Sequence, residues 1–125
     1  MITGFEEQTK DLTAEEKRQA RFAWQGMQAA FREGRSITAG QIATIICSGT
    51  GVKLGGPRIR KMINWMHISG HLPGLIADSN GYRRAQSRQE LESYLESLAS
   101  RISAIRGRYK ATERDIKNLD QGDLF

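Results

Sequence analysis

The chain has 125 residues, of which 38% are hydrophobic and 26% are charged, and a formal net charge of +5. This composition is typical of one small globular domain. A single cysteine, Cys47, excludes an internal disulfide and a cysteine-based zinc site and favours a reducing compartment. No apolar run is long enough to cross a bilayer, and no secretory signal opens the chain, so we expect a cytoplasmic protein without a membrane span.

The positive charge is concentrated in the middle of the chain. Residues 1–16 carry a net charge of −4, residues 17–90 carry +9 from twelve cations and three anions, and residues 91–125 are neutral. A basic segment between acidic and neutral ends is typical of a protein that binds a polyanion. The alternative is that the charge serves only solubility.

The first predicted helix covers residues 13–33 and follows a polar leader, residues 1–12. Thr13 and Glu16 have the spacing of a capping box, in which each side chain binds the other residue's backbone amide. Gly34 stands where the helix should end. Apolar residues recur at helical spacing at Ala20, Ala23, Trp24, Met27 and Phe31, and we expect Trp24 and Phe31 to be buried against the other helices.

The second predicted helix begins at Thr38, which forms another capping box with Gln41. We expect it to end near Ser48, because the glycines of Gly49-Thr50-Gly51 make continuation of the helix costly. Cys47 lies on its apolar side without a base nearby in sequence, so we interpret it as a small buried hydrophobe.

The third predicted helix starts at Pro57, where the missing N–H costs nothing, and ends at Gly70. Its apolar stripe consists of Ile59, Met62, Ile63 and Met66. The opposite face has no acidic residue and consists of Arg58, Arg60, Lys61, Asn64 and His67. Because a solvated helix normally mixes charges, this face indicates a surface for a polyanion.

Two short strands are predicted next, at residues 75–77 and 82–85. The connection between them contains Asn80-Gly81, a pair that supplies the positive φ values of a tight hairpin. Between the first two helices, Ser36-Ile37 leaves room only for a very short extended piece.

A long helix is predicted over residues 87–119, and Ser87 and Glu90 form its capping box. Its apolar positions alternate in steps of four and three, which is a heptad pattern with one polar position. They are Leu91, Leu95, Leu98, Ile102, Ile105, Tyr109, Thr112, Ile116 and Leu119. Two interpretations stay open: a coiled-coil homodimer, although Arg101 and Arg106 would oppose each other in a parallel pair, or packing on the first helix of the same chain.

The predicted fold is mainly α with a small β-hairpin: a winged helix-turn-helix domain at residues 13–86, the long C-terminal helix and a tail, residues 120–125. Residues 55–66, 70–77 and 81–82 resemble small winged-helix proteins of bacteriophages and prophages. The resemblance covers roughly residues 5–110. It implies that the third helix and the hairpin bind DNA in replication or lysogeny. One departure is the turn from residue 48 to 56, which is longer than in a standard helix-turn-helix.

Candidate DNA contacts follow from side-chain chemistry. Arginine can bind guanine in a bidentate manner, asparagine can pair with adenine and lysine can neutralise phosphate. The candidates are Lys53, Arg58, Arg60, Lys61, Asn64, Arg83 and Arg84. Arg83 and Arg84 alternate along a strand, so we expect only one of them to face nucleic acid.

No catalytic or metal site is expected. The glycine-containing segment 49–56 lacks the Gly-Lys-Ser/Thr ending of a phosphate-binding loop, and no nucleophile is paired with a base. His67 and His71 have no third ligand nearby. We therefore expect neither enzymatic activity nor a cofactor.

The last five residues resemble the pentapeptide with which bacterial replication and repair proteins bind the sliding clamp. Four positions match, namely Gln121, Asp123, Leu124 and Phe125, and Gly122 is the departure. Gln121 can form a hydrogen bond at the mouth of a pocket, while Leu124 and Phe125 can fill an apolar cleft. The alternative is that these two apolar side chains fold back on the domain.

These features lead to three functional hypotheses. The first is a phage-encoded accessory protein that binds double-stranded DNA and is associated with replication through the sliding clamp of its bacterial host. The second is a dimeric transcriptional repressor that reads a palindromic operator. The third is an adaptor whose positive face binds an acidic protein without touching DNA.

Overall fold

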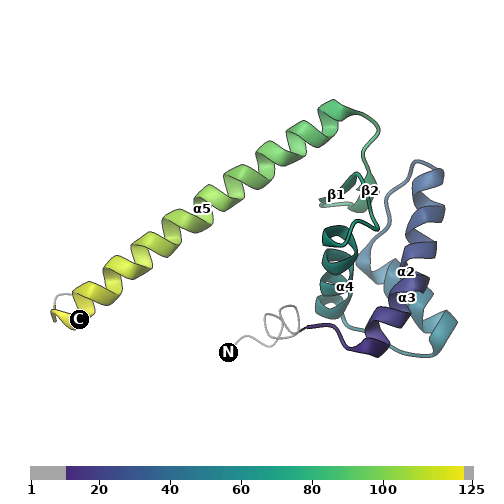
Figure 1. Cartoon of the computed structure of the whole chain (residues 1–125), viewed down its shortest axis with the longest axis horizontal. Helices are drawn as coiled ribbons and strands as arrows, with labels where there is room; N and C mark the ends of the chain where they lie inside the picture. Colours follow the sequence, from purple (N-terminus) through teal and green to yellow (C-terminus); the bar gives the residue numbers. More distant parts are fainter. Residues whose placement is uncertain (1–10, 123–125) are drawn as a thin grey trace. The chain divides into compact units, whose positions relative to one another are not determined.

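The computed structural model describes residues 11–122, and the chain divides into two units, Met1–Gln86 and Ser87–Phe125. Residues 11–86 of the first unit form three helices and a β-hairpin (Figure 1): α2 (Ala14–Arg32), α3 (Ala39–Thr50), α4 (Gly56–Ile68), β1 (Leu75–Asp78) and β2 (Gly81–Arg84). The second unit consists mainly of one helix, α5 (Arg88–Asp120). The prediction of a mainly helical fold with a small hairpin and a long C-terminal helix is confirmed.

The helix starts follow the predicted caps. Thr13 Oγ1 accepts a hydrogen bond from Glu16 N at 3.0 Å, and Glu16 Oε1 accepts one from Thr13 N at 3.0 Å. Thr38 and Gln41 form the same reciprocal pair at the start of α3. Ser87 Oγ accepts from Glu90 N at 3.2 Å. Each cap satisfies amides that the first helical turn leaves without partners.

The end of α3 differs from the prediction. The helix does not stop near Ser48 but continues through Gly49 to Thr50, and Gly51 follows with a φ of +76°. A Cβ atom on Gly49 would lie 2.6 Å from Phe22 Cδ1, so this glycine allows a close approach of α2 and α3. The helix therefore tolerates a residue of low helix propensity at position 49, because the close packing of α2 and α3 leaves no room for a side chain there.

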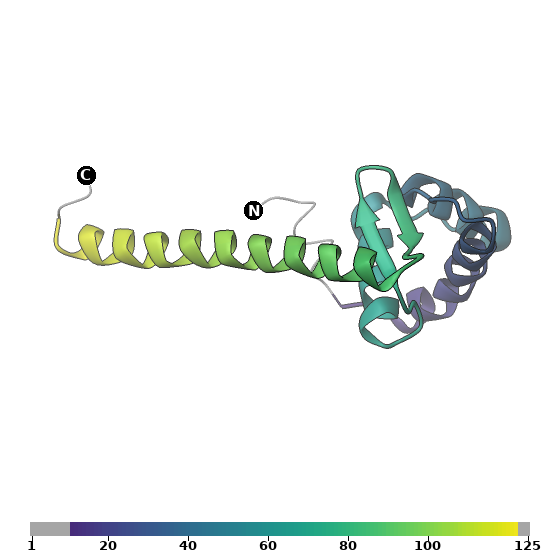
Figure 2. The ribbon, with the colours of Figure 1, turned by 90° about the horizontal axis from the view of Figure 1, so that it is seen from above.

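The hairpin is antiparallel, with Leu75 opposite Arg84 and Asp78 opposite Gly81, and Figure 2 shows its two strands side by side. The short extended piece predicted between the first two helices is also present: Ile37 exchanges two backbone hydrogen bonds with Tyr82, at 2.9 and 2.8 Å. Of the Asn80-Gly81 pair, Gly81 alone has a positive φ, +113°. A Cβ atom on Gly81 would clash with the carbonyl oxygen of Ile37, so glycine is required here.

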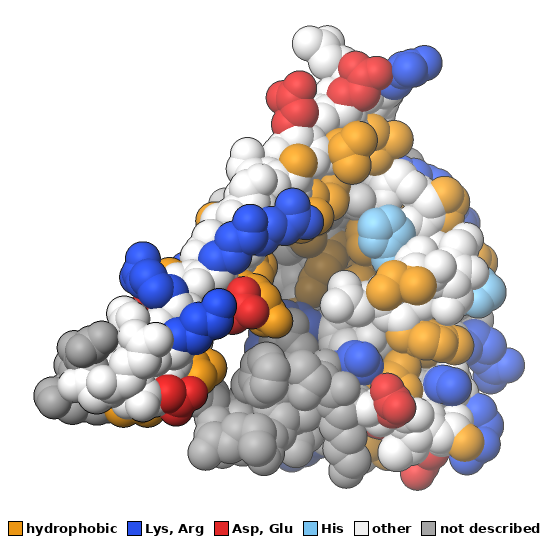
Figure 3. Space-filling model, turned by 60° about the vertical axis from the view of Figure 1, so that its left-hand side comes forward, with side chains coloured by type: hydrophobic (Ala, Val, Ile, Leu, Met, Phe, Trp, Pro, Cys, Tyr) orange, Lys and Arg blue, Asp and Glu red, His pale blue; other side chains and the backbone are white. Residues whose placement is uncertain are grey.

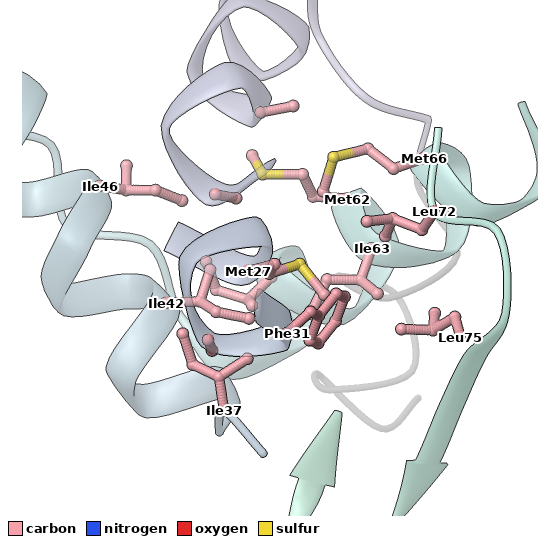
Figure 4. Packing of buried hydrophobic residues seen from close by; sticks show 14 residues of the cluster. Met27, Phe31, Ile37, Ile42, Ile46, Met62, Ile63, Met66, Leu72 and Leu75 are labelled. Carbon is pink, nitrogen blue, oxygen red and sulfur yellow. The ribbon is translucent and has the colours of Figure 1, made fainter. Parts of the chain in front are cut away.

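The core of the first unit lies between the three helices and the hairpin (Figure 4). Its largest fully buried side chains are Met27, Ile42, Ile46, Ile59, Met62, Ile63, Met66 and Leu72. Burial of one such side chain is worth about 1.5–3 kcal/mol, so this cluster is the main source of stability. Cys47, expected to be buried, is only partly buried.

Trp24 was expected in the core, and this prediction is wrong, because its side chain is 40% exposed. Its indole Nε1 donates a hydrogen bond to the backbone oxygen of His71 at 3.0 Å. The ring thus joins α2 to the segment after α4, with its polar edge satisfied at the surface.

Helix α5 is continuous over 33 residues. All of it lies in the described part of the chain, and none of its residues is buried. Within residues 11–122, no helix is long and apolar enough to span a bilayer.

Candidate nucleic-acid interface

The exposed face of α4 brings together four of the polar residues singled out from the sequence. Arg60, Asn64 and His67 are exposed and Lys61 is half-buried. Positions 60, 64 and 67 share one side of the helix because they are spaced by four and three residues. The helix contains no acidic residue, and Gly55 precedes it without a side-chain cap. This face, which we call the α4 face (Arg60, Lys61, Asn64 and His67), is therefore polar and positively charged.

Arg60 extends back toward the start of its own helix. Its Nη1 lies 3.1 Å from the position that a Cβ atom on Gly56 would occupy. The guanidinium therefore lies over the glycine, close to the positive end of the helix dipole. A guanidinium beside the first turn of a helix is an arrangement that suits an anionic ligand.

Arg58 was predicted to lie on this face, and the structure contradicts that prediction. Arg58 is only 8% exposed, as is Glu16, and their side chains form a buried ion pair. Arg58 Nε donates to Glu16 Oε2 at 2.8 Å, and Nη2 donates to Glu16 Oε1 at 2.6 Å. A guanidinium bound in this way joins α2 to α4 and is not available as a DNA contact.

The spacing of Arg58 along α4 is a signal in the sequence that would have indicated its burial. Arg58 is four residues before Met62 and eight before Met66, both of which are buried, so it belongs to the inner stripe of α4. The pKa of the Glu16 carboxyl is lowered to about 2, chiefly by hydrogen bonding from Arg58, while burial opposes the shift. Glu16 therefore stays ionised beside Arg58 across the neutral pH range.

The two hairpin arginines are also engaged within the protein. Arg83 Nε donates to Asp78 Oδ2 at 3.2 Å across the hairpin. The Arg84 guanidinium lies over the ring of Phe31, with 5.6 Å between the guanidinium carbon and the ring centroid. The two adjacent side chains thus have different partners within the chain, and Asp78 balances the charge of Arg83.

Lys53 is exposed in the connection between α3 and α4, residues 51–55. This connection is shorter than the sequence suggested because α3 extends to Thr50. Its five residues still exceed the three or four of a standard helix-turn-helix.

The structure adds a cation that was not among the candidates from the sequence. Lys17 of α2 lies with its ammonium 5.6 Å from the centroid of the Trp65 ring. Lys17, Lys61 and Asn64 line one shallow hollow of about 370 Å³. The other lining residues are Asp11, Leu12, Trp65 and Ile68. The signal in the sequence was the helical spacing of Lys17, Arg21 and Trp24 on the side of α2 that faces away from the core.

Comparisons with protein-family models, curated proteins and solved structures found no match to this chain. Within residues 11–122, no three side chains of His, Cys, Asp or Glu are grouped so that they could hold a metal ion.

Proposed function

We propose that the first unit is a winged helix-turn-helix domain that binds double-stranded DNA through the α4 face. The observation that carries the proposal is that α4 buries Ile59 and Ile63 in the core while its exposed side has cations and an amide but no acid. A helix of this kind matches the width and the negative potential of the DNA major groove.

The order of elements supports the winged-helix assignment. A helix, a short extended piece at Ile37, two further helices and a hairpin follow one another, and Ile37 pairs with Tyr82 on β2. The extended piece therefore adds to the two-stranded hairpin at the β2 edge. In such a domain the third helix enters the groove and the hairpin lies along the backbone.

The chemistry of the α4 face suggests a division of roles. Arg60 can bind guanine through two hydrogen bonds, and Asn64 can bind adenine in the same manner. Lys61 and Lys53 supply point charges for phosphate oxygens. Lys17 extends the positive surface from α4 toward α2.

The proposal is tested by fluorescence anisotropy with a labelled generic duplex over a salt series. We expect the wild-type chain to bind more weakly as salt rises, because binding to phosphates releases counterions. The triple variant Arg60→Ala, Lys61→Ala and Asn64→Ala should bind at least about tenfold more weakly, since one base contact is worth about 1–3 kcal/mol. Its salt slope should fall by about 1, because Lys61 is the one phosphate contact among the three side chains that are removed.

The chain offers a matched control on α5. Arg114→Ala, Lys117→Ala and Asn118→Ala remove the same three side-chain types from exposed or half-exposed positions. This control variant should keep the wild-type affinity. Equal affinity in both triple variants, or binding by the wild type that is independent of salt, would overturn the proposal and favour the adaptor hypothesis.

We further propose that this DNA binder is associated with replication through the bacterial sliding clamp. The support is the C-terminal pentapeptide, of which Asp123, Leu124 and Phe125 lie outside the described residues. Gln121 is the C-cap of α5, and Gly122 follows with a φ of +79°. The glycine that departs from the motif thus has a role in ending the helix. A clamp that encircles DNA would raise the effective concentration of a weak DNA binder.

A dimeric repressor is the second candidate, and the uncovered heptad positions of α5 favour it. Footprinting separates the two functions. A repressor protects two half-sites about one helical turn apart, whereas a replication accessory protein binds duplexes without a palindrome.

A further inference from the structure

Helix α5 presents an apolar seam, interrupted by the polar Thr112, that the other residues of 87–122 do not bury. Seven of the nine seam positions are large hydrophobic side chains that are 40–66% exposed: Leu91, Leu95, Ile102, Ile105, Tyr109, Ile116 and Leu119. Hydrophobic side chains recur along this helix beside Lys and Arg side chains (Figure 3). Soluble proteins seldom leave an apolar stripe of this length open to water unless it is an interaction surface.

The period of the seam indicates the kind of partner. A straight α-helix drifts by about 20° per heptad against a strict seven-residue repeat. Over the four heptads from Leu91 to Leu119 the stripe would therefore rotate by about 80° away from a flat surface. A second helix with the same repeat removes the mismatch, because the two helices can supercoil around each other.

We infer that the partner is a second copy of this chain, whose α5 pairs with the first in a two-stranded coiled coil. Among residues 11–122, α5 is the helix that has this repeat. The inference does not rest on the proposed DNA binding.

The size of the seam is sufficient for a dimer of modest affinity. Leu91 and Leu119 are 28 positions apart, so the seam is about 42 Å long. If about a third of the helix circumference is covered, about 600 Å² is buried on each copy. The total of about 1,200 Å² lies at the lower end of the range for specific interfaces, so the dimer should dissociate on dilution.

The charges beside the seam give the dimer a distinctive salt dependence. Arg101, Arg106 and Arg108 flank Ile105 near the middle of the seam, and residues 97–112 contain no acid. When the middles of two seams meet, these arginines repel one another. Added salt screens this repulsion and should strengthen the dimer, whereas it weakens binding to DNA.

The test is analytical ultracentrifugation of the full chain without DNA. At high micromolar concentration we expect a species of twice the 14.0 kDa monomer mass, and this species should persist to lower concentration in high salt. The variant Ile102→Lys with Ile105→Lys should be monomeric, because each copy then buries two charges in the seam. A matched control, Ser100→Lys with Ser103→Lys, adds the same charge away from the seam and should remain dimeric.

Circular dichroism distinguishes loss of the dimer from loss of the fold. The core of the first unit contains no α5 residue. The unfolding transition of the first unit should therefore be the same in the seam variant and in the control. A wild-type chain that sediments as a monomer at high micromolar concentration would overturn the inference. So would a seam variant that dimerises as well as its control. Neither result bears on the DNA-binding test of the α4 face.

Discussion

The Arg58 guanidinium is bound by the Glu16 carboxylate through hydrogen bonds of 2.8 and 2.6 Å, although 42 residues separate them in sequence. Arg58 Nη2 also donates to the backbone oxygen of Asp11 at 3.0 Å. Glu16 in turn accepts from Thr13 N at the start of α2. This buried pair connects the first turn of α2 to the first turn of α4, the helix on which Arg60 lies. The ion pair thus contributes to placing the α4 face.

The first prediction concerns acid. Hydrogen bonding from Arg58 lowers the pKa of Glu16 from its ordinary value of 4.5 to about 2. Because the folded pKa is below the unfolded pKa, the stabilisation is complete above about pH 5 and is lost as the pH falls toward 2. The loss should reach about 3 kcal/mol at most. Urea unfolding at pH 7, 4, 3 and 2 measures it.

The control for the acid experiment is the Glu16→Gln variant, in which the titrating carboxyl is absent. Its free energy of unfolding should fall less steeply between pH 5 and 2. An identical pH dependence in both proteins would show that the ion pair does not cause the acid sensitivity.

The second prediction concerns the cost of breaking the pair. Glu16→Gln leaves the buried Arg58 charge uncompensated and should lower the free energy of unfolding by about 3–5 kcal/mol. The double variant Glu16→Leu with Arg58→Met removes both charges. Its loss in free energy of unfolding should be smaller than the summed losses of the single variants Glu16→Leu and Arg58→Met. Urea unfolding of all the variants gives the coupling. Additive losses would mean that the two side chains act independently.

The third prediction compares two helical glycines. A Cβ atom on Gly49 would meet the Phe22 ring at 2.6 Å, whereas nothing lies within 4 Å of a Cβ atom on Gly107. Gly49→Ala should therefore destabilise the first unit by about 1–3 kcal/mol, despite the higher helix propensity of alanine. Gly107→Ala should stabilise α5 by up to about 1 kcal/mol.

Thermal unfolding followed by circular dichroism at 222 nm measures both glycine changes. If Gly49→Ala were as stable as the wild type, the close approach of α2 and α3 would not need a glycine. A destabilising Gly107→Ala would indicate that α5 is covered at this position.

The fourth prediction concerns the C-terminal tail. Removal of residues 121–125 should abolish binding to a bacterial sliding clamp in a calorimetric titration, and so should Leu124→Ala with Phe125→Ala, because these side chains are the apolar anchors. Asp123→Ser is the matched control, since this position of the motif is variable, and it should bind as the wild type does. Equal binding with and without the tail would end the clamp hypothesis.

Local patterns in the sequence were sufficient to predict the elements of this protein. Thr13 with Glu16 and Thr38 with Gln41 marked helix starts to within one residue, because a cap depends on atoms only three residues apart. The extended piece at Ile37 and the long helix α5 were likewise predicted from neighbouring residues. The seam of α5 was visible for the same reason, since helical periodicity is a local property.

Tertiary structure alone decided which side chains are available at the candidate interface. The helical spacing of Arg58 indicated the inner side of α4, but its partner Glu16 is 42 residues away and only the folded chain brings the two together. Trp24 was predicted to be buried, although its indole binds the His71 backbone at the surface. Gly49 was predicted to end a helix because its contact with Phe22 comes from another element. In each case the deciding free energy, of ion pairing, hydrogen bonding or close packing, comes from groups that only the folded chain brings together.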